Sequence, residues 1–274
     1  NPGARPGLAS FTAGMLDEGT TTRSSLQIAD EVALLGASLG ANASMDGTTV
    51  SMRSLRSNFD ATLTLAADIV LRPTFPDAEI ERQRQARLGQ LTQQRDNANA
   101  ITARVVGATL FGETHPYGFP DNGTEAATRA MTRDELVAFW KENYVPNNAA
   151  LVVAGDISMA ELRTLAEKAF GAWARGTPAV PQLNVPAAPA ARVVIVDRPG
   201  AAQTQLNVVT LGAPRSSPDF RALQVMNMAL GGSFSGRINM NLREEHGYTY
   251  GAYSQFVFRR LSGWFQAEIG RAHV

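Results

Sequence analysis

Cysteine is absent from the 274 residues, and histidine occurs only three times. Without thiols the chain can form neither disulfides nor thiolate metal sites. Basic and acidic residues number 25 each, so charge gives no argument for binding nucleic acid or an anionic membrane surface. No apolar run approaches the ~20 residues that span a membrane. What is present, 44% hydrophobic and 18% charged residues, is typical of a globular chain with a sizeable core.

The chain begins without Met and without a signal-peptide pattern. We expect it to be a segment of a longer protein, with any targeting sequence upstream. The absence of cysteine does not fix the compartment. A periplasmic location is a working hypothesis, based only on a bacterial-looking, cysteine-free chain.

Apolar periodicity predicts most of the secondary structure in the first two thirds of the chain. Helical spacing predicts helices over about 7–16, 25–35, 59–71, 77–97 and around 101–110. The capping sequences Thr132-x-x-Glu135 and Ser158-x-x-Glu161 predict two more. Alternation after the Asp46-Gly47 turn predicts a strand over 49–53. An apolar run predicts a buried strand over 149–154.

Prolines then mark a boundary. Four of them between residues 176 and 190 indicate an extended linker over 177–190. Beyond it we predict strands over 192–197 and 205–211, helices over about 217–230 and 235–246, and a hairpin joining 248–258 to 263–269. The mixture favours the α+β class, with antiparallel sheets packed with helices. We expect a first domain over 1–176 and the front part of a second over 191–274. If both share one fold, two strands precede residue 1.

The first sequence motif is GLASFTAGMLDEGT, residues 7–20. It resembles the zinc helix of the pitrilysin/insulinase family of zinc peptidases, in which His-x-x-Glu-His stands between the same Gly-Leu-Ala and Met-Leu…Gly-Thr flanks. The resemblance puts Ser10 and Gly14 at the two His positions and Ala13 at that of the general base. It also implies a Glu ligand near 83–91, a stretch that contains no acid. Composition alone would make this simply an amphipathic core helix.

The chain's histidines do not form another metal site. His115, His246 and His273 are far apart in sequence. We interpret His115 as a turn residue and His246 as a helix C-terminal residue near free carbonyls. Residues 242–246 approach the zinc pattern, but Leu242 occupies the first ligand position. We predict no metal in this chain. Ser10 as a nucleophile is disfavoured because no His or Lys lies near it in sequence.

The second motif is LGGSFSGRINMNLREEHGYTYG, residues 230–251. It resembles the signature of the family's second homologous domain. The resemblance implies that Arg243 and Tyr250 reach across a closed chamber toward the zinc site of the opposing domain. There they would hold substrate backbone and the developing oxyanion, a task suited to fixed hydrogen-bond donors. The alternative is a solvated helix-end arginine and an ordinary strand tyrosine.

The resemblance therefore implies a non-catalytic subunit. Some bacterial members work as heterodimers, in which one chain carries zinc and the other the Arg/Tyr pair. We expect this chain to be inactive alone and to bind a homologous zinc-bearing partner and a peptide substrate, with zinc only in the partner. The competing hypothesis is a non-enzymatic scaffold or assembly subunit with a decayed peptidase fold.

Overall fold

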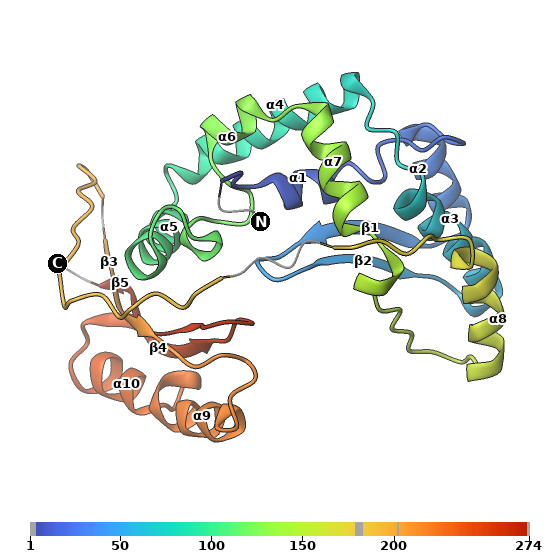
Figure 1. The fold of residues 1–274 in the computed structure, drawn as a ribbon. Helices are drawn as coiled ribbons and strands as arrows, with labels where there is room; N and C mark the ends of the chain where they lie inside the picture. Colours follow the sequence, from blue (N-terminus) through green and yellow to red (C-terminus); the bar gives the residue numbers. More distant parts are fainter. Residues whose placement is uncertain (1–3, 179–182, 202, 273–274) are drawn as a thin grey trace. The chain divides into compact units, whose positions relative to one another are not determined.

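The computed structural model describes residues 4–178, 183–201 and 203–272. Contacts divide the chain into two compact units (Figure 1). The first contains Asn1–Leu91 and Asp121–Pro181, and the second contains Thr92–Pro120 and Gln182–Val274. The described residues of the proline-rich stretch, 177–178 and 183–190, form no helix or strand. The division into two homologous domains joined by a linker at 177–190 stays a prediction.

The first unit combines one β-hairpin with several helices. Its helices are α1 (Leu8–Ala13), α2 (Ser25–Leu34), α3 (Phe59–Leu71), α4 (Asp77–Gln94), α6 (Glu125–Ala130), α7 (Arg133–Asn143) and α8 (Met159–Phe170). Short 3-10 turns lie at η1 (Arg56–Asn58) and η3 (Pro146–Asn148). The hairpin pairs β1 (Ser38–Ala43) with β2 (Thr48–Arg53) in antiparallel register.

Side-chain caps set where these helices begin. The predicted capping box at Thr132 and Glu135 is present at the start of α7. The Ser158 side chain accepts from the N–H of Glu161 at the start of α8, also as predicted. Each cap satisfies an N–H group that has no partner within the helix.

The hairpin strand β2 confirms the prediction for 49–53, and the N–H of Ser44 closes the turn on the carbonyl of Gly47 at 2.8 Å. Strand β1 was missed. Its sequence, SLGANA, consists mostly of small residues with little strand preference. The segment forms a strand because β2 pairs with it. The sequence pattern within the segment does not reveal that pairing.

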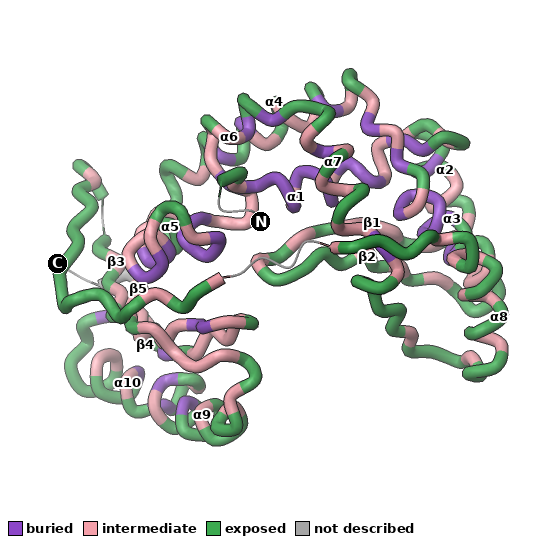
Figure 2. The backbone as a smooth tube through the Cα atoms, viewed as in Figure 1, coloured by how far each residue is buried: buried purple, intermediate pink, exposed green. Residues whose placement is uncertain are grey.

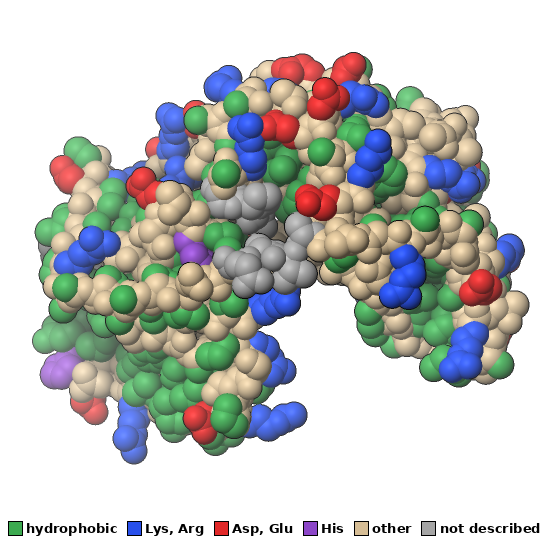
Figure 3. Space-filling view, in the orientation of Figure 1, with side chains coloured by type: hydrophobic (Ala, Val, Ile, Leu, Met, Phe, Trp, Pro, Cys, Tyr) green, Lys and Arg blue, Asp and Glu red, His purple; other side chains and the backbone are tan. Residues whose placement is uncertain are grey.

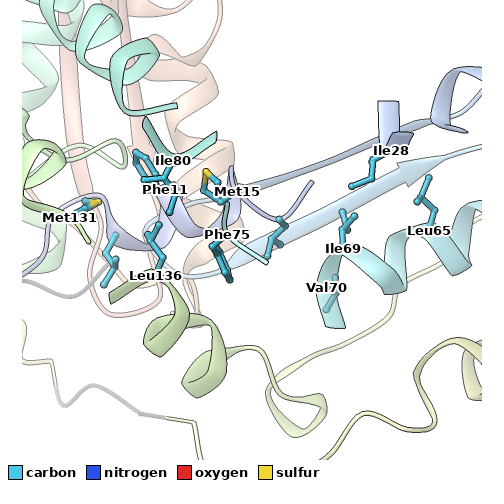
Figure 4. Packing of buried hydrophobic residues seen from close by; sticks show 12 residues of the cluster. Phe11, Met15, Ile28, Leu65, Ile69, Val70, Phe75, Ile80, Met131 and Leu136 are labelled. Atoms are coloured by element: carbon cyan, nitrogen blue, oxygen red, sulfur yellow. The ribbon is translucent and has the colours of Figure 1, made fainter. Parts of the chain in front are cut away.

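The core of the first unit gathers around α1, which lies against both hairpin strands and against α7. Figure 2 shows this helix as mostly buried, whereas α8 is exposed or half-buried. In Figure 4, Phe11 and Met15 point toward Phe75, Ile80 and Leu136. Burying such side chains contributes about 1.5–3 kcal/mol each. Helix α1 is therefore fixed by its packing, although it has only six residues.

A buried carboxylate fixes the segment that follows α1. The Asp68 side chain of α3 is 0% exposed. Its Oδ2 accepts from Thr20 Oγ1 at 2.7 Å, Thr22 Oγ1 at 2.8 Å and Arg23 Nη1 at 3.0 Å. Its Oδ1 accepts from Arg72 Nε at 2.7 Å. Burial alone would raise the pKa of Asp68, but these four donors outweigh it and lower that pKa.

The second unit is built on a three-stranded antiparallel sheet with the order β3-β5-β4. Its strands are β3 (Thr204–Leu211), β4 (Thr249–Val257) and β5 (Trp264–Ala272). Its helical segments are α5 (Ala98–Phe111), η2 (Pro116–Gly118), α9 (Phe220–Asn227), η4 (Met228–Gly232), α10 (Arg237–Asn239) and η5 (Met240–Glu245). Helix α5 contacts β3, whereas α9, η4, α10 and η5 contact β4. The predicted hairpin is present as β4 and β5, and the α+β class is confirmed.

Two predicted strands are wrong. Residues 149–154 and 192–197 form no strand. Their apolar side chains are exposed, with Val152 at 88% and Ile195 at 84%. A strand needs a neighbour that takes up its backbone N–H and C=O groups. Within the described residues no neighbouring strand pairs with either segment. The apolar residues of these segments predicted buried strands, but in the structure the segments are largely exposed.

The surface agrees with the neutral composition. Figure 3 shows both basic and acidic side chains on the visible face of each unit. In the part of the chain that the structure describes, no helix has both the length and the apolar character needed to span a bilayer.

Candidate functional site

Helix α1 carries the three positions that the family resemblance singles out. Gly7 precedes the helix with φ of +85°, and Gly14 follows it as the C-cap. Ala13 is 0% exposed and packs in the core. Ser10, by contrast, is half-buried. The helix is thus present and packed, while neither Ala13 nor Gly14 offers a side chain that could act on a substrate or a metal.

Ser10 is held in a hydrogen-bond network. Its hydroxyl lies 2.7 Å from the carbonyl oxygen of Asp121 and 3.0 Å from that of Gly7, and it can donate to either. Its oxygen accepts from Arg87 Nη1 at 3.0 Å. No His or Lys side chain is among these partners. A serine nucleophile needs a base to take its proton, so the structure gives no support to Ser10 as one.

Arg87 is the residue of this region that the sequence reasoning missed. It lies on α4, within the stretch where the resemblance implies an acidic ligand. Its Nη1 also donates to the carbonyl of Gly7 at 3.1 Å, and its Cζ lies 4.8 Å from the centroid of the Phe11 ring. Burial lowers the pKa of Arg87 to about 10. The available signal was that this stretch contains two arginines, Arg84 and Arg87, and no acidic residue.

These residues do not fit zinc. A zinc site needs imidazole, thiolate or carboxylate ligands, and α1 offers a hydroxyl already engaged with an arginine cation. Among the described residues, no group of three or more His, Cys, Asp or Glu side chains could hold a metal ion. His115 is the predicted turn residue, whose Nδ1 accepts from the N–H of Tyr117. His246 caps η5, and His273 lies outside the described residues.

The second candidate position, Arg243, lies in η5, a wide turn of π-helix. Its Cζ is 4.5 Å from the centroid of the Phe234 ring. Its Nη1 lies 3.4 Å from Glu244 Oε1, an ion-pair contact, and makes no hydrogen bond to the described residues. The side chain is 33% exposed. The guanidinium is therefore oriented by a ring and a neighbouring carboxylate, with donors left over.

A chain reversal separates Arg243 from Tyr250. Gly247 adopts φ of +66°, a conformation that favours glycine. Its N–H donates to the carbonyl of Arg243 at 3.1 Å, and the N–H of Tyr248 donates to the carbonyl of Leu242 at 2.9 Å. Tyr250 then enters β4 and is 65% exposed. Strand β4 contacts η5, so the two candidate residues lie on adjoining elements. Their common role stays a prediction.

Buried asparagines hold β4 against these helical segments, which the sequence reasoning did not foresee. Asn239 is 0% exposed. Its Nδ2 donates to the carbonyl of Phe234 at 2.6 Å, and its Oδ1 accepts from the N–H of Ala252 at 3.1 Å. Asn227 makes a similar pair of bonds with the carbonyl and hydroxyl of Ser254. The spacing of apolar residues in the sequence does not distinguish a buried asparagine that joins two elements from an asparagine on the surface.

A separate cavity of about 520 Å³ opens beside η4, β4 and β5. Met228, Tyr253 and Glu268 are among its lining residues, whereas Arg243 and Tyr250 are not. The cavity is thus not part of the predicted Arg/Tyr site.

Two protein-family models match the chain. The one described as Peptidase M16 inactive domain matches residues 130–273, and the one described as Insulinase (Peptidase family M16) matches residues 1–117. Together with the α+β fold and the altered helix α1, they define a metallopeptidase-like domain of the inactive type. The chain belongs to peptidase family M16, the insulinase family.

Individual proteins similar to this chain agree with this family assignment. The crystal structure of the peptidase M16 inactive domain from Pseudomonas fluorescens has a TM-score of 0.92 and 31% identity, covering 98% of this chain and 65% of that chain. An uncharacterized zinc protease of Mycobacterium leprae is 29% identical over 90% of this chain and 56% of the relative. Pitrilysin has a TM-score of 0.77 and 18% identity over 99% of this chain and 30% of its own, a likeness of fold alone. The chain thus spans less than two thirds of the length of these proteins.

Proposed function

We propose that this chain is the non-catalytic subunit of a two-chain zinc peptidase. It supplies Arg243 and Tyr250 to a peptide held at the zinc of a homologous partner subunit. The observation that carries the proposal is the contrast between the two motifs. The α1 positions offer no ligand or base, while the Arg/Tyr positions keep residue types that can stabilise charge.

The partner's zinc would activate water and polarise the scissile carbonyl. This chain's contribution is to hydrogen-bond the peptide. The guanidinium of Arg243 carries a permanent charge and donors in a fixed fork, and the side chain is 33% exposed. The hydroxyl of Tyr250 adds a single donor on a rigid ring. Negative charge that develops on the carbonyl oxygen would be stabilised by such preorganised donors.

The test is reconstitution. The chain is mixed with the product of a neighbouring reading frame that carries His-x-x-Glu-His, and hydrolysis of a short fluorogenic peptide is followed. We expect each chain alone to be inactive and the mixture to be active. Arg243→Ala should lower kcat by about 100- to 1,000-fold, the typical effect of losing one oxyanion donor. Arg237→Ala removes an exposed arginine from the same helical region and should leave kcat unchanged.

Tyr250→Phe separates the hydroxyl from the ring, and Tyr253→Phe is its matched control on β4. Complex formation is measured for every variant by analytical ultracentrifugation. If Arg243→Ala and Tyr250→Phe assemble and turn over like the wild type, the donor role is wrong. The scaffold hypothesis would then be favoured, because contacts with Phe234 and Glu244 already give Arg243 a structural role.

A further inference from the structure

The guanidinium of Arg87 is a partly buried cation without an acidic partner among the described residues. Desolvation is the only influence on its pKa, which falls to about 10. Its hydrogen bonds go to the Gly7 carbonyl and the Ser10 hydroxyl, both neutral groups. No carboxylate of the described chain forms an ion pair with it. Other arginines of α4 differ, since Arg82 pairs with Glu18 and Glu79, and Arg84 with Glu81.

An unpaired buried charge is costly to a folded protein, because water no longer solvates it and no counter-charge replaces the water. Arg87 is only partly buried and so bears part of that cost, and its guanidinium also has hydrogen-bond donors beyond those that it uses. Both of these hydrogen bonds leave from Nη1, while a guanidinium has five N–H groups in a planar fork. The residue is half-buried, so part of it remains within reach of solvent and of a small ligand.

We infer that Arg87 and Ser10 form a binding site for a carboxylate. A carboxylate matches the fork in two parallel, charge-assisted hydrogen bonds, and the Ser10 hydroxyl can rotate to add another. One guanidinium balances one negative charge. A phosphate would call for further cations, and the nearby arginines are engaged: Arg84 donates to the carbonyls of Thr128 and Met131 in addition to its ion pair.

The source of the carboxylate follows from the proposed function. A peptide brings one at its C-terminus, so the peptide terminus is the occupant that we assign, and this part of the inference rests on the chain acting on peptides. The carboxylate site itself needs neither the zinc-bearing partner nor Arg243. Its failure and that of the proposed function are therefore distinguishable, because the site is tested on this chain alone.

The experiment is calorimetric titration of the whole chain at neutral pH and constant ionic strength. The probes are trialanine with a free C-terminus, its C-terminal amide, an amidated peptide with an internal Glu, and acetate. We expect trialanine to bind at least about tenfold more tightly than its amide, the lower end for a hydrogen-bonded charge pair. Tighter binding of trialanine than of acetate and of the Glu peptide identifies the peptide terminus. Equal binding of trialanine and its amide overturns the site.

Substitutions at Arg87 test whether this residue causes the preference for a free carboxylate. Arg87→Gln should abolish the preference for the free carboxylate, while Arg53→Gln, which removes an exposed arginine of the same unit, should keep it. A preference that survives in Arg87→Gln overturns the assignment. In the absence of carboxylates Arg87→Gln should unfold at the same or a higher urea concentration than the wild type, because it removes an unpaired charge. If it does not fold, Arg87→Lys keeps the charge without the fork and should lose at least half of the preference, whereas an unchanged preference refutes bidentate binding.

Discussion

Replacing Asp68 by asparagine tests whether this buried carboxylate fixes the segment after α1. The wild-type side chain accepts three hydrogen bonds at Oδ2, from Thr20, Thr22 and Arg23, and one at Oδ1, from Arg72. An asparagine amide has one acceptor oxygen. If the amide oxygen faces the first three donors, the amide NH₂ group faces Arg72 Nε. Both of these groups are donors, so the hydrogen bond to Arg72 is lost.

The expected loss follows from these contacts. A hydrogen bond to a charged group contributes about 1.5–3 kcal/mol, and breaking a buried ion pair by removing one partner costs about 3–5 kcal/mol. Here the arginines can partly rehydrate, since the Arg72 side chain is 51% exposed and that of Arg23 25%. We therefore expect Asp68→Asn to lower the free energy of unfolding by about 2–4 kcal/mol.

Asp60→Asn is the matched control on the same helix. Asp60 pairs with Lys168, but the two side chains are 49% and 60% exposed. Exposed pairs contribute about 0–1 kcal/mol, so this variant should be nearly as stable as the wild type. Urea unfolding at neutral pH is followed by circular dichroism and by tryptophan fluorescence, to which Trp140 and Trp173 of the same unit contribute.

The pH dependence provides a second check. The pKa of Asp68 is lowered in the folded protein, so its stabilisation is complete above the unfolded pKa of about 3.9 and is lost as the pH falls through the folded value. Asparagine does not titrate. The difference between wild type and Asp68→Asn should be constant near neutrality and shrink in acid. A difference below about 1 kcal/mol at neutral pH, or one that persists unchanged in strong acid, would refute the reasoning.

Two further substitutions probe the backbone around the motifs. Gly7→Ala puts a Cβ 2.7 Å from the carbonyl oxygen of Asn122 at φ of +85°, and should cost clearly more than the ~1 kcal/mol expected from conformational strain. Gly36→Ala, at φ of +56° with open space around it, should cost only that strain; equal urea midpoints for the two variants would contradict the clash. Asn239→Ala leaves the buried N–H of Ala252 without its acceptor and should cost about 1–3 kcal/mol. Hydrogen exchange of that amide should accelerate, and unchanged protection would show that the bond is dispensable.

Local signals determined much of the molecule. The capping boxes, the helical spacing and the alternation of β4 and β5 act within a few residues, so the sequence alone predicted these elements. The same holds for family membership, because both motifs are contiguous stretches of chain. The Gly7 and Gly19-Thr20 flanks were recognisable for the same reason, and the fold explains them: Gly7 needs a positive φ, and Thr20 donates to Asp68.

Tertiary structure decided the rest. Strand β1 exists because β2 pairs with it, while the apolar segments 149–154 and 192–197 form no strand, since no strand of the described chain pairs with them. Whether an arginine is solvated, paired or left unpaired also depends on side chains distant in sequence, as the contacts of Arg87 with Gly7 and Ser10 show. Short-range patterns specify which helix or strand a segment prefers. Burial and charge compensation arise only when distant segments meet.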